Sequence, residues 1–407
     1  MAPTDAPCID AAGLDRPTAA PARVALVLLA LAMGGFAIGV TEFAAMSVLP
    51  DFAAGLGVDE PTAGHVISAY AAGVVVGAPI LAVLGARLPR WTLLIGFMAL
   101  FAIGNALSAL APTYGWMLVF RFLSGVPHGA YFGVAALVAA SLVPLRLRTR
   151  AVSTILLGLT IATVIGVPVA TAVSHAFGWR WTFAIVSVLA VLTMALVALF
   201  APRDPAHPDA SPLRELGALK RGQVWLTLGV GAVGFGGMFA VYAYLASTLM
   251  AVTGVGPEVL PWVFAVFGVG MTAGNLIGAW AADRYGMKAA GGLLLWSAGA
   301  LALYPFAAPH LWAMMVVVLL IGCGGGLGSI LQTRLMDVAG DAQTLAAALN
   351  HSAFNTANAI GPLLGGMAVA AGWGWTSTGW VGVGLTLGGF AIWVVAYITG
   401  RRLQTAS

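Results

Sequence analysis

Charged side chains are scarce in this sequence. Of its 407 residues, 8% are charged and 60% are hydrophobic, and the mean hydropathy is +0.97. A soluble protein carries about 25% charged residues, because its surface must face water. A chain this poor in charge cannot cover its outside with polar groups. The composition therefore excludes a soluble globular protein and predicts an integral membrane protein whose outer surface faces the lipid bilayer.

Cysteine is scarce as well, with Cys8 in a polar N-terminal stretch and Cys323 in an apolar run. Two cysteines placed in this way predict neither a disulfide framework nor a metal site. Residues 1–22 lack the basic segment and apolar core of a signal peptide. We interpret them as a retained, disordered tail. In a membrane protein the net charge of +4 indicates no nucleic-acid partner, since the positions of the charges matter more than their sum.

Long charge-free runs are abundant. About 20 apolar helical residues cross a bilayer core about 30 Å thick, and runs of this size, bracketed by charges, proline and glycine-rich turns, occur twelve times. The predicted fold class is an all-α membrane protein with twelve transmembrane helices. The predicted spans are 23–48, 62–85, 91–111, 115–142, 150–173, 180–201, 223–250, 259–281, 289–306, 311–335, 343–370 and 376–399.

The basic residues orient these spans. With both termini in the cytoplasm, sixteen of the 18 Lys and Arg residues fall on the cytoplasmic side, as the positive-inside rule requires. Arg180 falls outside and Arg121 lies within a span. A miscounted helix would scramble this segregation, so we expect a multi-pass protein of the bacterial inner membrane with cytoplasmic termini. The sixteen are Arg16, Arg23, Arg87, Arg90, Arg146, Arg148, Arg150, Arg203, Arg214, Lys220, Arg221, Arg284, Lys288, Arg334, Arg401 and Arg402.

The two halves of the chain repeat each other weakly. "FGWRW" at 177–181 corresponds to "AGWGW" at 371–375, and "TIATVIGVP" at 160–168 resembles "FNTANAIGP" at 354–362. Parallel repeats are typical of secondary transporters, which bind substrate between the repeats. We predict two pseudo-symmetric halves. The predicted order is a cytoplasmic tail at 1–22, an N-terminal six-helix half at 23–201, a cytoplasmic linker at 202–222, a C-terminal six-helix half at 223–400 and a cytoplasmic tail at 401–407.

One carboxyl group lies deep in an apolar span. Glu42 interrupts "IGVTEFAAMSVLP", and the corresponding stretch near Gly236 carries no acid. A carboxyl group in a low-dielectric cavity holds its proton more tightly than one in water, so it can exchange a proton in the physiological range. Glu42 is therefore our candidate proton carrier, with Phe43 beside it assigned to the substrate cavity. The alternative is a protonated carboxyl that only bonds a neighbouring helix.

A four-residue spacing follows in "RFLSGVPHGAYFGV" at 121–134. Arg121, Gly125, Gly129 and Gly133 fall on one helix face. The glycines predict a groove for a neighbouring helix. An arginine inside a span costs at least about 2.5 kcal/mol unless it is paired or hydrated, so Arg121 must face the interior of the bundle. It either takes part in proton coupling or only ties helices together through carbonyl groups.

Aromatic and titratable residues share this span. His128 lies two turns after Arg121, near the same face. Its imidazole suits proton exchange near neutral pH, although a packed neutral histidine is the alternative. Tyr131 and Phe132, one turn further on, either line the cavity or simply pack. In the second half, Asn355 and Asn358 lie three residues apart on one helix face. They either contact substrate or bond a neighbouring helix, because polar groups in lipid need partners.

Taken together, these stretches resemble the major facilitator superfamily. Within it, the chain is most similar to the twelve-helix drug:proton antiporter family, and closest to the arabinose and sugar-efflux permease group. The resemblance covers essentially the whole chain. It rests on the combination of "GFAIGVTEF" (35–43), "AGHVISAYAAGVVVGAP" (63–79), "RFLSGVPHGAYFGV" and "GVPVAT" with "GWRWTF" (166–171 and 178–183).

The resemblance implies roles for several residues. It implies that Arg121 acts in proton transfer or tunes a nearby acid. In the fifth span it implies a helix-bending seal, for which this chain has Gly166 and Pro168, although Val167 separates them. A cleaner copy, "GPLLGG", begins at Gly361 and Pro362 in the eleventh span. Ordinary small-residue packing is the alternative for both.

The resemblance also implies a latch on the cytoplasmic side. The loop between spans eight and nine, Asp283-Arg284-Tyr285-Gly286-Met287-Lys288, matches the superfamily's D-R-x-G-x-K pattern. The corresponding first-half loop keeps Gly85 and Arg90 but has Pro89 in the place of the acid. That loop therefore lacks the acid on which a first-half latch would be based.

The function expected from these features is proton-coupled export of a sugar or drug-like small molecule by alternating access. A proton symporter or an uncoupled facilitator is the alternative within the same class. An intramembrane enzyme using Ser329 and His351 is a remote one, because no paired acid or metal cluster completes such a site. No phosphate-binding glycine-rich loop is present, so the proton gradient rather than a cofactor is the expected driving force. The resemblance implies a monomer.

Overall fold

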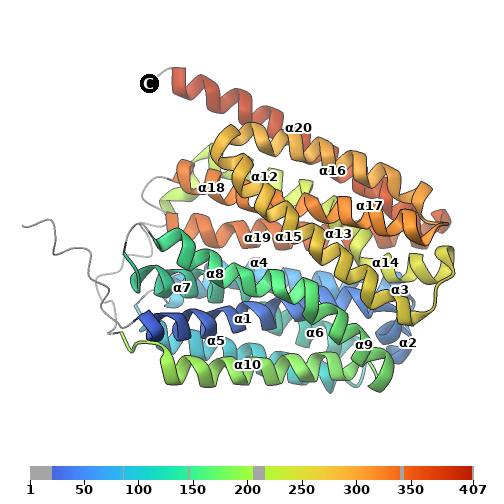
Figure 1. Ribbon diagram of the computed structural model, residues 1–407, viewed down its shortest axis with the longest axis horizontal. Coiled ribbons are helices and arrows are strands. Elements are labelled where there is room, and N and C mark those ends of the chain that lie inside the picture. Colours follow the sequence, from blue (N-terminus) through green and yellow to red (C-terminus); the bar gives the residue numbers. More distant parts are fainter. Residues whose placement is uncertain (1–20, 86, 145–146, 205–215, 340–342, 406–407) are drawn as a thin grey trace, which may run out of the picture.

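The computed structural model describes residues 21–85, 87–144, 147–204, 216–339 and 343–405, and these are almost entirely helical. The helices lie roughly side by side in two layers (Figure 1), one formed by the first half of the chain and one by the second. We call the end at which α1 begins and α20 ends the terminal end, and the opposite end the far end. They are the left and right ends of Figure 1.

The first layer consists of α1 (Pro21–Ser47), α2 (Leu49–Leu56), α3 (Glu60–Ala63), α4 (His65–Gly85), α5 (Arg90–Ala109), α6 (Tyr114–Gly125), α7 (His128–Ser141), α8 (Arg148–Ile161), the π-helical turn η3 (Ala162–Gly166), α9 (Val167–Phe177) and α10 (Arg180–Phe200). The second layer begins with η4 (Leu216–Lys220), α12 (Gly222–Gly234), α13 (Gly236–Ala243), α14 (Leu245–Thr248), η5 (Leu249–Thr253), η6 (Pro257–Val259) and α15 (Leu260–Tyr285). It continues with α16 (Met287–Ala307), α17 (Leu311–Cys323), η7 (Gly324–Gly326), α18 (Leu327–Ala339), α19 (Gln343–Ala368), η8 (Val369–Trp373) and α20 (Ser377–Thr405).

Eleven helices within the described residues are long and apolar enough to cross a membrane. Each begins and ends close to a predicted span. Their limits are Ala22–Ser47, Glu60–Leu81, Arg90–Ala109, Tyr114–Ser141, Ala151–Phe177, Arg180–Phe200, Gly222–Ala243, Pro257–Tyr285, Met287–Ala307, Leu311–Ala339 and Ser377–Gly400.

The helix predicted as the eleventh span differs from these. α19 has 26 residues, which is long enough to span, yet it is not among the eleven apolar helices. The reason is its polar side chains, which include His351, Asn355 and Asn358. α19 can lie at membrane depth because neighbours from both layers cover it. It contacts α4 and α7 of the first layer and α12, α13, α18 and α20 of the second.

The two layers meet along a few helix pairs. α19 packs on α4, and α15 packs on η3 and α9. At the second of these contacts Gly268 of α15 lies against the backbone of Thr163 in η3, where a side-chain carbon on Gly268 would collide with the Thr163 carbonyl group. At the far end, α2 contacts α14 and α3 contacts α19. The layers are therefore in contact from the middle of the molecule to the far end.

The first-half loop before α5 has no acid of its own, and an acid from elsewhere in the chain bonds the beginning of that helix. Asp204, which follows α10, accepts hydrogen bonds from the backbone N–H groups of Arg90 and Trp91, both at 3.2 Å. A carboxylate at the beginning of α5 satisfies free N–H groups and complements the helix dipole. The sequence has Pro89 where the acid was expected. The structure supplies the carboxylate from Asp204 instead, in the segment that follows α10.

Most of the predicted tail at 1–22 and of the predicted linker at 202–222 lies outside the described residues, which omit 1–20 and 205–215. The predicted tail at 401–407 is described only to residue 405, as the end of α20. These boundaries stay predictions.

Close backbone packing joins α6 to α4. A side-chain carbon on Gly125 would collide with the carbonyl oxygen of Tyr70, whereas Gly133 on α7 faces open space. Small residues allow membrane helices to approach in this way.

We therefore expect Gly125→Ala to lower the free energy of unfolding, by about 1–3 kcal/mol, because it overpacks this contact. The matched Gly133→Ala variant should be neutral or slightly stabilising, since it adds the same methyl group to a helix without a collision. Thermal unfolding midpoints of the two purified variants in detergent test this. Equal midpoints for both would contradict the prediction.

Candidate proton-coupling site

Glu42 lies at the contact between the two layers. Its side chain, on α1, is 1% exposed. Its Oε1 accepts a hydrogen bond of 3.1 Å from Nδ2 of Asn358 on α19. Its Oε2 is buried without a hydrogen-bond partner among the described residues. One oxygen of the acid is thus bound to the opposite layer, and the other is available for a proton.

Arg121 lies close to this acid but bonds the residue beside it. Its guanidinium group donates to Oγ1 of Thr41 at 2.9 Å and to the Thr41 carbonyl oxygen at 3.3 Å. It also lies over the ring of Tyr70, 4.3 Å from the ring centre. In the described part of the chain no ion pair joins Arg121 to Glu42. The arginine therefore stays buried through neutral partners and a ring face, within the first layer.

Thr41 extends this hydrogen bonding to a third helix, α5. Its hydroxyl donates to Oδ1 of Asn105 at 2.6 Å, and Asn105 donates to the carbonyl oxygen of Phe101 on its own helix. α1, α5 and α6 are therefore tied together directly beside Glu42. This fixes the position of the acid within the first layer, so that its bond to Asn358 is the one that crosses between layers.

A second polar group lies on the terminal side of Glu42. The hydroxyl of Tyr70 and Nδ1 of His128 share a hydrogen bond of 3.0 Å. The His128 ring lies 5.9 Å from the ring of His351 on α19, and Phe132 stacks on His351 at 4.8 Å. His128 and Phe132 were both predicted as site residues, and the structure places them together with two residues that the sequence analysis had not linked to them.

The polar face of α19 carries the second layer's share of the site. His351, Asn355 and Asn358 follow one another at helical spacing on one face. Asn355 and Asn358 are fully buried, and the Oδ1 atoms of both have no hydrogen-bond partner within the described structure. Buried polar atoms are rarely left unpaired in native proteins. The two Oδ1 atoms are therefore unused acceptors that can bind a ligand or the protonated form of a neighbouring acid.

Aromatic rings cover the site toward the second layer. Phe43 packs against Phe239 at 6.2 Å and against Tyr242 at 5.6 Å, and Phe354 packs on Phe239 at 5.0 Å. The hydroxyl of Tyr242 is buried and unpartnered among the described residues. Tyr131, for which the sequence analysis left cavity lining and plain packing open, lies inside the first layer, where its hydroxyl donates to the carbonyl oxygen of Leu31.

The residues predicted to bend helices occupy two different settings. Gly166 ends the π-helical turn η3 and Pro168 follows at the beginning of α9, so the α-helical hydrogen bonding of the fifth span is interrupted there. Gly361 and Pro362 lie inside α19, which continues as one α-helix past them. Gly361 lies directly against the backbone of Gly236, so in this helix the glycine provides a close approach to α13.

The predicted cytoplasmic latch lies at the terminal end, away from Glu42. Asp283, Arg284 and Lys288 are all exposed. Gly286 separates α15 from α16 with a φ of 53°, which favours glycine. Of the first-half residues, Gly85 ends α4 against Leu93, and Arg90 begins α5.

Contacts between the layers also close the far end. Ser247, on α14, donates a hydrogen bond to the carboxyl group of Glu60, and Ser68 on α4 donates to the Ala359 carbonyl oxygen of α19 at 2.9 Å. Next to Glu60, hydrogen bonds from Thr62 lower the pKa of the Asp59 carboxyl, which begins helix α3 as its N-cap. Asp59 therefore stays charged at the far surface.

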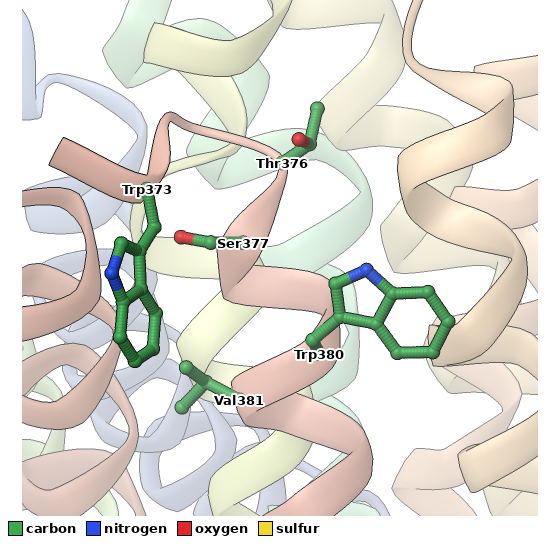
Figure 2. Close-up of a pocket in the computed structure, with 5 residues that line it drawn as sticks. All are labelled: Trp373, Thr376, Ser377, Trp380 and Val381. Atoms are coloured by element: carbon green, nitrogen blue, oxygen red, sulfur yellow. The ribbon is translucent and has the colours of Figure 1, made fainter.

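A surface pocket elsewhere does not take part in this arrangement. Figure 2 shows it, lined by Trp373, Thr376, Ser377, Trp380 and Val381, with a volume of about 420 Å³. It lies where α19 ends and α20 begins, and none of these five side chains is ionisable.

Sequence reasoning missed Tyr70 and underused His351. Tyr70 lies in the quoted "AGHVISAYAAG" stretch, but an aromatic residue in an apolar helix gives no signal of a polar partner. His351 was considered only with Ser329. The hydroxyl of Ser329 donates to the Gly326 carbonyl oxygen, whereas His351 packs against Phe132 and His128, so the contacts of the two residues do not assemble a hydrolytic pair.

The chain is similar to known membrane transporters over most of its length. The family model described as Major Facilitator Superfamily matches residues 31–250 and again 226–406. The inner membrane transport protein YdhP of Escherichia coli (strain K12) is 38% identical over 350 residues, which cover 86% of this chain and 90% of that protein. AraJ of the same strain is 34% identical, with 85% and 88% covered. A chloramphenicol resistance protein of Streptomyces lividans is 34% identical, with 83% and 88% covered.

A solved structure has the same fold. It is a bacterial homologue of the human lysosomal transporter Spinster, described as inward-facing and unoccupied, with a TM-score of 0.71 at 17% identity. It covers 93% of this chain, and the match extends over 98% of that chain. The predicted all-α fold and the predicted superfamily are confirmed, and the alternative of an intramembrane enzyme is excluded. The chain belongs to the Major Facilitator Superfamily and is a membrane transporter.

Proposed function

We propose that this transporter exports a small molecule in exchange for protons, with Glu42 as the proton carrier. The observation that carries the proposal is the hydrogen bond between Glu42 of the first layer and Asn358 of the second, together with the unpartnered Oε2 of Glu42. A charged carboxylate is costly to bury without full pairing. A group placed in this way can change its charge and thereby change the contact between the layers.

The chemistry of an acid facing an amide supports this coupling. When Glu42 is protonated, its carboxyl group gains a hydrogen-bond donor. The amide already bound to Oε1 has an unpartnered acceptor, Oδ1 of Asn358. The neutral acid can then both donate to and accept from the same amide, whereas the charged acid can only accept. Protonation thus alters the bond that joins the layers, which is what coupling to alternating access requires.

The orientation and energy source complete the proposal. The positive-inside rule places the terminal end in the cytoplasm, so the layers of this structure are in contact on the outer side. Protons would move inward from the outer side as substrate moves outward. The proton gradient supplies the driving force without a cofactor, and one chain is the functional unit.

The substrate class follows from the lining of the site. Phe43, Phe239, Tyr242 and Phe354 provide ring faces, and the asparagine Oδ1 atoms of α19 provide acceptors. These groups suit a neutral or amphiphilic small molecule with hydrogen-bond donors. The name of the Streptomyces lividans relative, a chloramphenicol resistance protein, supports testing a drug of that kind beside a sugar.

For this site, our first prediction is that Glu42→Gln abolishes proton-driven export, because glutamine keeps the shape and the hydrogen bond but cannot exchange a proton. Proteoliposomes with an imposed pH gradient should be screened with small neutral compounds, beginning with chloramphenicol and L-arabinose. The direction of proton flux, read with a trapped pH dye, separates an exporter from a symporter.

Two controls accompany this test. The Glu42→Gln protein should elute and unfold like the unaltered protein, since the substitution is isosteric. It should also still exchange labelled substrate across the membrane without a gradient. Undiminished pH-driven export by this variant would contradict the assignment of Glu42 as the proton carrier.

A second prediction concerns Asn358. Asn358→Ala removes the amide that binds Glu42, and a hydrogen bond to a charged group contributes about 1.5–3 kcal/mol, or about 10- to 100-fold in an equilibrium constant. We expect proton-driven export to fall by that order. Thr356→Ala is the matched control, because Thr356 lies on the same helix and donates only to the Ser352 carbonyl oxygen of that helix. A loss of similar size in both variants would show that α19 is merely sensitive to substitution.

A further inference from the structure

We propose that His128 and His351 form a proton-release station between Glu42 and the terminal end of the transporter. This inference rests on the proposed proton coupling through Glu42. The two imidazoles come from different layers, His128 from α7 and His351 from α19, and their ring centres are 5.9 Å apart. A titratable pair thus lies where the layers touch, on the side of Glu42 that the proposed function assigns to proton release.

The exposed fraction of the side chain is higher at His351 than at Glu42 or His128. Glu42 and His128 are each 1% exposed, whereas His351 is partly exposed. α19 begins at the terminal end, and His351 precedes Asn358 by seven residues, which places it about 10 Å nearer that end. His351 is therefore the member of the group that water from the terminal end reaches first.

A string of contacts connects the residue beside the acid to the pair. Arg121 bonds Thr41, the neighbour of Glu42, at 2.9 Å. The same guanidinium group covers the ring of Tyr70, and the hydroxyl of Tyr70 shares a hydrogen bond of 3.0 Å with His128. This hydrogen bond fixes the orientation of the His128 ring toward α19. Tyr70 is thus a positioning residue, since it acts through His128.

The charges balance in the proposed transfer. The proton that leaves the carboxyl group of Glu42 restores a carboxylate, and the imidazole that takes it becomes an imidazolium, so the summed charge of the two groups is unchanged. Two imidazolium rings at this separation would repel each other, so the pair holds one proton at a time. The proton then passes from His351 to water at the terminal end.

Other ionisable groups around the pair leave this role open to it. Tyr70 on α4 bonds His128 from the first layer, and Arg121 on α6 lies over the ring of Tyr70. On α18, which packs against α19, Arg334 donates to Gln223 and Asp337 is exposed. Neither of these α18 groups takes part in the described contacts of the histidine rings. Among the described residues, the one buried acid of this neighbourhood is Glu42 itself.

The test measures proton movement without any substrate. Everted vesicles that contain the protein are adsorbed on an electrode, and a rapid pH step is applied to the cytoplasmic face. The unaltered protein should give a transient current that Glu42→Gln abolishes. A variant carrying both His128→Gln and His351→Gln should slow that current about 100-fold or more, the usual effect of removing a proton-transfer group. The total charge displaced should stay the same, because Glu42 still binds its proton.

Two further variants separate a proton-transfer role from a structural one. Tyr70→Phe keeps the ring under Arg121 but removes the hydroxyl, and it should slow the current less than the double variant. His310→Gln, which alters an exposed histidine between α16 and α17, should leave it unchanged. If the double variant fails to fold, His351→Gln alone is measured.

The two proposals fail in different ways. A current with the normal rate in the folded histidine variants, still abolished by Glu42→Gln, would overturn the release station and leave Glu42 as the carrier. A current that persists unchanged in Glu42→Gln would overturn both.

Discussion

Polar groups at membrane depth must find partners inside the protein, and this constraint determines where α19 lies. Water is absent from the bilayer core, so an exposed asparagine or histidine there is costly. α19 carries several such residues and is the one long helix of the described second layer that lacks the apolarity of a span. It is therefore covered by helices of both layers. The polar helix becomes the contact between the layers because lipid cannot solvate it.

The site that results is asymmetric. The first layer supplies the charged and titratable groups Glu42, Arg121 and His128, and it holds Arg121 through Thr41 and Tyr70. The second layer supplies amides and one histidine, all from α19. Because the acid is fixed within the first layer, a change in its charge acts mainly on the bond to Asn358. A change of charge in the first layer therefore changes a hydrogen bond to the second layer.

The sequence predicted the helices well because the signals that define them are local. Charge-free length, proline and glycine-rich turns and the arginine distribution place each span within a few residues. The same scarcity of charge marked Glu42 as exceptional. Its partner could not be predicted, because Asn358 is 316 residues away and Asn355 on the same helix face had equal standing. Arg121 was expected either to act in proton coupling or to tie helices together, and its guanidinium group bonds Thr41, the residue beside Glu42. Tyr131 shares a helix with His128, but only the packing of α7 on α1 turns it inward.

The contacts between the layers also constrain how they can move. Ser68 bonds Ala359 and Ser247 bonds Glu60, so opening of the far end must break both hydrogen bonds as well as the packing of α2 on α14. At the terminal end the first-half loop is held by Asp204 of its own layer, whereas the loop from Asp283 to Lys288 is exposed. The hydrogen bond between Glu42 and Asn358 lies between these two regions. A rearrangement of the layers that separates α1 from α19 therefore has to break or alter this bond.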